Sequence, residues 1–142
     1  MRNGVPRAVL DTNVLVSALI SPGGGSARLL LELRSGAFEL IVSPLLLAEL
    51  REVLGRDKLR RYVSEVEADA YVELIRSEAV LRADPAPSPE ALSADPDDEY
   101  LVDLARDAGV DALVTGDAHL LDLRAIIAAM TPAEFLATLP EI

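Results

Sequence analysis

Short apolar runs alternate along the chain with longer segments in which apolar residues recur every three to four positions. The short runs predict strands at 7–10, 38–42, 79–81, 112–115 and 126–128. The longer segments predict helices at 14–20, 26–34, 44–54, 64–78, 97–108 and 132–139, with a shorter helical stretch at 57–62. Strands that alternate with helices predict an α/β domain, in which helices cover both faces of a mostly parallel sheet of about five strands.

Several of these helices carry signals at their ends. Ser43-Pro44 is a capping serine followed by a proline at the first helical position, and Gly109 stands where the 97–108 helix should stop. The proline-rich stretch 83–96 predicts a surface loop. A length of 142 residues suits a single domain, so we expect one unit over 1–142.

The composition excludes several kinds of chemistry. Cysteine is absent and His119 is the single histidine, which excludes a disulfide scaffold, a thiol nucleophile and any site that needs two histidines. The net charge of −11 does not attract phosphate backbones, so nucleic-acid binding would need bound cations or a local basic patch. The N-terminal residues lack the pattern of a signal peptide and no apolar run reaches 18 residues, so we expect a cytoplasmic protein.

Two aspartates follow predicted strands. In open parallel sheets, binding sites lie beyond the carboxyl ends of the strands, where the strand order reverses. Asp11 comes directly after the first strand and Asp117 comes two residues after the strand at 112–115. We expect both at one edge of the sheet, although each could simply cap the helix that follows it.

Two further acids lie on predicted helices. Glu49 flanks the apolar stripe of the 44–54 helix near Val53, where a glutamate can also reach out to water. Asp98 shares one helical face with Leu101, and Asp95 or Asp97 is available as the helix cap. The spacing therefore predicts that Asp98 points toward the sheet, the alternative being a simple interaction with the helix N-terminus.

Four carboxylates at one sheet edge would repel one another unless a cation neutralised them. Ligation by oxygen alone suits Mg²⁺ or Mn²⁺. A metal ion held by Asp11, Glu49, Asp98 and Asp117 could activate water and stabilise the charge on a phosphodiester. It would also make an acidic site attractive to phosphates.

Four segments resemble the PIN-domain ribonucleases: VLDTNVLVSAL (9–19), SPLLLAEL (43–50), DPDDEYLVDLA (95–105) and LVTGD (113–117). More narrowly, they are similar to bacterial PIN proteins that act as toxins of toxin–antitoxin systems, and with TPAEFL (131–136) the resemblance covers nearly the whole chain. It implies a Rossmann-like sheet and a Mg²⁺- or Mn²⁺-dependent endoribonuclease that hydrolyses single-stranded or structured RNA. A small antitoxin partner and a homodimer are also implied, and no association with a membrane.

The same resemblance assigns residues. Asp11, Glu49, Asp98 and Asp117 would be the catalytic and metal-binding acids. It further implies that Thr12 or Asn13 positions Asp11 or the substrate, and that Thr115 is a supporting hydroxyl.

A basic segment consists of Arg51, Arg56, Lys58, Arg60 and Arg61. It is a solvated helix end, a docking site for an acidic partner, or a rim that binds RNA phosphates, in which case Arg56 and Lys58 contact the substrate. His119 could orient a phosphate or a water, or simply lie in an exposed loop. Tyr62 and Tyr71 fall on helical stretches and are expected to pack in the core.

Two other enzyme classes fit less well. A haloacid-dehalogenase-like phosphatase needs a second aspartate where this chain has Asn13, and a phospho-accepting receiver domain needs a lysine after the last strands, whereas Lys58 is the only lysine. A PIN module that binds RNA or protein without cleaving it is the remaining alternative, because the sequence does not establish turnover.

Overall fold

The computed structural model describes residues 4–90, 92 and 96–140. Its sheet has five strands: β1 (Arg7–Leu10), β2 (Glu39–Val42), β3 (Val80–Leu81), β4 (Ala112–Val114) and β5 (Ala129–Met130). The strand order is β3-β2-β1-β4-β5, and every neighbouring pair is parallel. This confirms the predicted α/β class.

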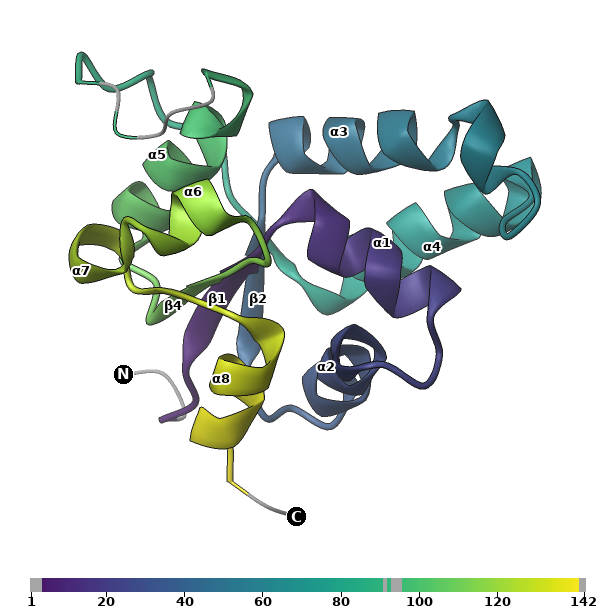
Figure 1. Cartoon of the computed structure of the whole chain (residues 1–142), viewed down its shortest axis with the longest axis horizontal. Helices are drawn as coiled ribbons and strands as arrows, with labels where there is room; N and C mark the ends of the chain where they lie inside the picture. The colour runs from purple at the N-terminus through teal and green to yellow at the C-terminus, as the bar shows by residue number, and fades with distance from the viewer. Residues whose placement is uncertain (1–3, 91, 93–95, 141–142) are drawn as a thin grey trace.

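Helices connect consecutive strands, as a parallel sheet requires. α1 (Thr12–Ile20) and α2 (Gly25–Arg34) lead to β2, and α3 (Pro44–Leu54), the 3₁₀ turn η1 (Asp57–Leu59) and α4 (Glu65–Glu78) lead to β3. The turn η2 (Pro96–Asp98) and α5 (Glu99–Ala108) precede β4, α6 (Ala118–Leu121) and α7 (Arg124–Ile127) precede β5, and α8 (Pro132–Thr138) follows it. Figure 1 shows α1–α4 on one side of the sheet and α5–α7 on the other, with α8 beside α2.

The central strands are apolar because both faces of the sheet are covered. Ala8, Val9 and Leu10 of β1 are buried, as are all three residues of β4. Leucines from the covering helices complete the core, among them Leu15 of α1 and Leu46 of α3, both fully buried. No described helix is by itself long and apolar enough to span a membrane; α1 and α2 reach that length only as a pair bent by 95°.

Helix ends follow the predicted signals. The Ser43 side chain accepts a hydrogen bond from the Leu46 amide, with Pro44 at the first position of α3. Gly109 ends α5 with φ +59°, in the left-handed region that glycine adopts without strain.

Two elements differ from prediction. Ile126 and Ile127, expected in a strand, form the end of α7, and the strand begins only at Ala129. Ile126 is 59% exposed and Ile127 is buried, so the two side chains lie on different sides of a helical turn. The helix expected at 97–108 begins at Glu99, because Pro96–Asp98 form a 3₁₀ turn.

The strand order creates a switch point at the centre of the sheet. The chain runs outward from β1 through β2 to β3, then crosses to β4 and β5 on the other side of β1. The carboxyl ends of β1 and β4 therefore lie side by side, with Leu10 paired to Val114. Ligands of open α/β sheets bind at such a point, so the residues just after these two strands are candidates for a site.

Candidate functional site

Asp11 lies at this switch point and is only 5% exposed. Its backbone amide donates to the carbonyl oxygen of Val114 at 2.9 Å, which continues the pairing of β1 with β4. Its Oδ2 accepts a hydrogen bond of 2.8 Å from the Thr115 hydroxyl, and its Oδ1 accepts one of 3.3 Å from the Asn13 amide. Asp11 thus caps α1, as the simpler interpretation held, and also faces the end of β4.

Burial raises the pKa of Asp11 above its ordinary value, because the charged carboxylate loses water. Hydrogen bonds from Thr115 and Asn13 oppose this shift, whereas the negative charges of Glu49 and Asp117 add to it. Three carboxylates from separate parts of the chain therefore influence one another electrostatically at the switch point.

Glu49 lies on α3 and is held by two hydroxyl groups. Its Oε1 accepts a hydrogen bond of 2.8 Å from Thr12, the first residue of α1, and a second from the hydroxyl of Tyr100 on α5. The two hydroxyl oxygens are 3.5 Å apart. Glu49 therefore turns toward α1 and α5, although it is partly exposed.

Tyr100 is a functional candidate that sequence reasoning missed. Burial and the hydrogen bond to Glu49 raise the pKa of its phenol, so the hydroxyl keeps its proton and remains a donor. Nothing in the sequence distinguishes this tyrosine from Tyr62 or Tyr71. Its role depends on the approach of α5 to α3, which only the tertiary structure defines.

Asp117 is linked to Asp11 through a buried threonine. The Thr115 hydroxyl, which donates to Asp11, accepts a hydrogen bond of 3.0 Å from the Asp117 amide. The Asp117 carboxylate accepts a hydrogen bond of 3.1 Å from the His119 amide and thereby caps α6. His119 itself is exposed.

Asp98, not Asp97, occupies the N-cap position of α5, so the prediction of Asp97 as the cap is wrong; Asp95 lies outside the described residues. The Asp98 side chain makes no capping hydrogen bond. It is partly buried, whereas its neighbour Asp97 is exposed. Asp98 precedes Tyr100 by two residues, so the first turn of α5 brings it to the same end of the domain as Glu49. Its participation in the site stays a prediction.

The donor chemistry of Asp11, Glu49 and Asp117 fits a hard divalent cation, because every group is a carboxylate. In the part of the chain that the structure describes, however, no three acidic or histidine side chains are gathered closely enough to hold a metal ion. Both oxygens of Asp11 already accept hydrogen bonds. Metal binding would therefore require these side chains to move.

The basic segment extends from α3 through η1 and is partly paired. Arg51 lies 3.4 Å from Asp69 and Arg56 lies 2.9 Å from Glu52, while Arg60 donates to the backbone carbonyl of Val63. Lys58 is exposed, and the Arg61 guanidinium lies 5.6 Å from the centre of the Tyr62 ring. Some positive charges of the basic segment are thus paired within the protein, and others face solvent.

The two tyrosines predicted to pack behave differently. Tyr71 is buried and its hydroxyl donates to the Leu15 carbonyl at 2.6 Å, which confirms its packing role. Tyr62 is 58% exposed, so the prediction for this residue is wrong. The helical stretch predicted around it ends as the short turn η1 at Leu59, which leaves the ring without a core to enter.

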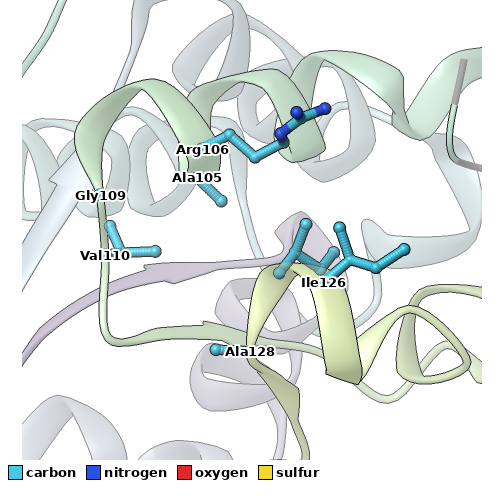
Figure 2. Close-up of a pocket in the computed structure, with 7 residues that line it drawn as sticks. Ala105, Arg106, Gly109, Val110, Ile126 and Ala128 are labelled. Atoms are coloured by element: carbon cyan, nitrogen blue, oxygen red, sulfur yellow. The ribbon is translucent and has the colours of Figure 1, made fainter. Parts of the chain in front are cut away.

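A separate pocket of about 310 Å³ lies between α5 and α7 (Figure 2). Arg106 is the only charged side chain among the described residues that line it. Gly109 and Ala128 place this pocket before β4 and β5, at the amino edge of the sheet, opposite the switch point. It is therefore independent of the carboxylates.

Comparison with known proteins defines the class. A family model described as the PIN domain matches residues 7–119, and the protein belongs to the PIN-domain family. Among solved structures, one similar chain comes from the crystal structure of VapBC2 from Rickettsia felis bound to a DNA fragment from their promoter. The match has a TM-score of 0.60 and 18% identity, and covers 82% of this chain and 91% of that one. No curated protein matches significantly.

Proposed function

We propose that this protein is a divalent-metal-dependent endoribonuclease that hydrolyses RNA phosphodiester bonds. The observation that carries the proposal is the buried Asp11 at the switch point of a PIN domain, electrostatically coupled to Glu49 and Asp117. A buried carboxylate whose pKa is perturbed by two other acids is typical of a functional site. Structural ion pairing does not explain it, because Asp11 has no basic partner among the described residues.

In this proposal, Asp11, Glu49, Asp98 and Asp117 hold Mg²⁺ or Mn²⁺ and form the catalytic group. A bound ion would activate a water molecule and neutralise charge on the phosphate under attack. Thr115 and the Asn13 amide fix the Asp11 carboxylate, and Thr12 fixes Glu49. Burial raises the pKa of Asp11 most, and repulsion by Glu49 and Asp117 adds to it. A nearby positive charge would favour the charged carboxylate against both effects, which supports a cation at this place.

The proposed substrate is RNA, either single-stranded or structured. Because the net charge is −11, phosphate binding must be local. The exposed Arg56 and Lys58 at the end of α3 and in η1 are the proposed phosphate contacts outside the acidic site. Such contacts would guide a strand along α3 toward Glu49.

We also propose that the protein is the toxin of a toxin–antitoxin pair and acts in the cytoplasm. The similarity to a chain of the VapBC2 structure supports a small antitoxin partner and a homodimer. Co-expression with the product of the neighbouring reading frame tests this part: the partner should copurify and suppress RNA cleavage.

A non-catalytic PIN module is the second candidate. The observation that favours it is that the described acids are not gathered into a ready metal site. Such a module would bind RNA or protein with the same affinity whether or not Mg²⁺ is present.

The deciding experiment incubates the purified protein with unstructured RNA in Mg²⁺, in Mn²⁺ and in excess EDTA. Cleavage in either metal that EDTA abolishes, and that Asp11→Asn removes, supports the nuclease. Asp122→Asn, an exposed aspartate just after α6, is the matched control and should cleave normally. Undiminished cleavage in EDTA would contradict the metal mechanism, and a folded protein that never cleaves RNA would favour the binding module.

A further inference from the structure

Tyr62 is the aromatic residue that faces solvent. The chain has two phenylalanines and three tyrosines, and of these Phe38, Phe135 and Tyr71 are buried while Tyr100 is half-buried beside Glu49. Tyr62 is 58% exposed. Core packing therefore does not explain this ring, which lies within the basic segment.

The backbone holds Tyr62 in a defined place at the surface. Its neighbours Leu59 and Val63 are buried, and the amides of Tyr62 and Val63 both donate to the Leu59 carbonyl, at 2.9 and 3.0 Å. The Arg60 guanidinium donates to the Val63 carbonyl at 3.1 Å. Because the turn is anchored on both sides of the ring, little further ordering is needed when the ring binds a ligand.

Cations surround the ring. The Arg61 guanidinium lies over it, 5.6 Å from its centre, which is within the range of cation–π attraction. Lys58 and Arg61 are exposed, and neither forms an ion pair with a described acidic residue. The guanidinium covers one face of Tyr62, so the opposite face is the one that a ligand could stack on.

This arrangement suits single-stranded RNA. Residues 51–62 include five basic and two acidic side chains, although the net charge of the whole protein is −11. Proteins that bind single strands combine such a local positive surface, which contacts phosphates, with aromatic side chains on which bases stack. An acidic peptide would use the same cations but not the face of the ring. We propose that Tyr62 stacks on an unpaired base of the RNA substrate, with Lys58 and Arg61 beside it for the phosphates.

This inference rests on RNA being the substrate in the proposed function, and it adds a binding point away from the acids. Figure 1 shows the connection from α3 to α4 at the end of α3 that points away from the sheet. Between Glu49 and Leu54, the last residue of α3, the helix rises by about 8 Å. A strand that lies along α3 would place one base on Tyr62 while another part reaches the acids. No base preference is expected, because every base has a face that can stack.

The first test places a fluorescent probe at this position. The protein contains no tryptophan, so Tyr62→Trp introduces a single indole, whose emission a stacked base quenches. Decauridine is titrated in Mg²⁺ into this variant in the cleavage-deficient Asp11→Asn background, and most of the emission should be lost. Ile126→Trp is the matched control, because Ile126 is 59% exposed and lies on α7, on the other side of the sheet. Its emission should stay unchanged.

The second test separates stacking from charge. Tyr62→Leu keeps an apolar side chain but removes the aromatic face. In the same background, fluorescence anisotropy with labelled decauridine should show binding weakened by about fivefold or more, as expected when one stacked base is lost. Tyr62→Phe should bind as tightly as the parent. The slope of affinity against salt should be the same in Tyr62→Leu, since no phosphate contact is removed.

Tyr62→Trp emission that persists while decauridine binds, or a Tyr62→Leu protein that binds as tightly as Tyr62→Phe, would overturn the proposal. No binding of decauridine at all would also overturn it. Tighter binding of decaglutamate than of decauridine would do the same and assign the segment to an acidic protein partner. Stacking by a wild type that never cleaves RNA would contradict the nuclease function alone, and cleavage without stacking would contradict this inference alone.

Discussion

The hydroxyl of Thr115 lies 2.8 Å from Oδ2 of Asp11, although 104 positions separate the two residues in the sequence. Thr115 is completely buried and serves both sides of the site, since its oxygen also accepts the Asp117 amide at 3.0 Å. One side chain thus sets the position of the carboxylate after β1 and of the loop after β4.

Thr115→Val is expected to lower both stability and RNA cleavage. Valine has nearly the same shape, so the change removes the hydrogen bonds with little loss of packing. Leaving the buried Asp11 oxygen without this donor should cost about 1–3 kcal/mol of unfolding free energy. Chemical denaturation measures the cost. Thr138→Val, whose hydroxyl bonds only to its own helix backbone at Phe135, is the control and should change stability much less.

Asp11→Asn is expected to raise the melting temperature of the metal-free protein at pH 7. Asparagine caps helices as well as aspartate does, and its NH₂ group can donate to Thr115. The replacement therefore removes the cost of burying a charge and the repulsion from Glu49 and Asp117, while a hydrogen bond to Asn13 and one to Thr115 can still form. A lower melting temperature in EDTA would show that Asp11 is mainly structural.

The increase in stability of the metal-free protein on Asp11→Asn should depend on pH. The folded protein holds the Asp11 proton more tightly than the unfolded chain, whose pKa lies near 3.8. Stability of the wild type therefore falls as pH rises from about this value through the folded pKa. The gain in stability should be small below pH 3.8 and full above the folded pKa of Asp11.

In the presence of Mg²⁺ or Mn²⁺, the wild type should have a higher melting temperature than Asp11→Asn, the reverse of the order in EDTA. An ion that binds only the folded wild type stabilises it by about 2.7 kcal/mol at 100 times its dissociation constant. For a domain of this size, that is roughly 8–11 °C in melting temperature. The variant should show a much smaller increment in Mg²⁺ or Mn²⁺. If it keeps the full increment, Asp11 is not a ligand.

Tyr100→Phe is expected to weaken metal binding and cleavage while the fold survives. The change leaves Glu49 with Thr12 as its remaining hydroxyl donor among the described residues, so the carboxylate is held less firmly in position. The Mg²⁺ or Mn²⁺ concentration that gives half-maximal cleavage should rise. Tyr62→Phe removes an exposed hydroxyl and should leave that concentration unchanged.

Asp98→Asn and Asp97→Asn separate two adjacent acids. Asp98 is partly buried at the start of α5, so Asp98→Asn should abolish cleavage. Asp97 is exposed, and Asp97→Asn should change stability by no more than about 0.5 kcal/mol. Initial cleavage rates and melting curves of both variants decide the question. Equal loss of activity at equal stability would refute the assignment of Asp98.

Replacing Arg56, Lys58 and Arg61 with glutamine should flatten the salt dependence of RNA affinity. Each lost phosphate contact lowers the log–log slope by about 0.7 for single-stranded RNA, so three contacts give about 2. Arg60 is left in place because it bonds to the Val63 carbonyl. Arg34, Arg76 and Arg124, replaced together, control for net charge. An unchanged slope would indicate that the basic segment does not contact RNA and is an ordinary solvated surface.

Local patterns in the sequence were sufficient to predict the sheet and most helices. Runs such as 7–10 are buried on both sides and leave a clear signal, and Ser43-Pro44 marks a helix start by itself. The strand predicted at Ile126-Ile127 was wrong because two adjacent isoleucines suit a strand and a short helix equally well. The predicted packing of Tyr62 was wrong because the helical stretch was expected to reach residue 62, whereas the helical turn ends at Leu59.

The places of Asp11 and Asp117 in the fold could be predicted, because positions relative to strands follow from the fold class. Asp11 and Asp117 follow β1 and β4, and parallel strands bring their carboxyl ends to one edge. Tyr100 could not be predicted, since its contact with Glu49 depends on the distance between α3 and α5.

The central position of β1 has a consequence for biosynthesis. Its pairing with β4 joins residues 104 positions apart. When a ribosome has translated only through β3, the nascent chain therefore contains Asp11 and Glu49 but not Tyr100 or Thr115. Neither acid then has its hydroxyl partner from the second half of the chain. If the protein is a ribonuclease, the nascent chain cannot damage its own messenger, because activity first arises when β4 inserts beside β1.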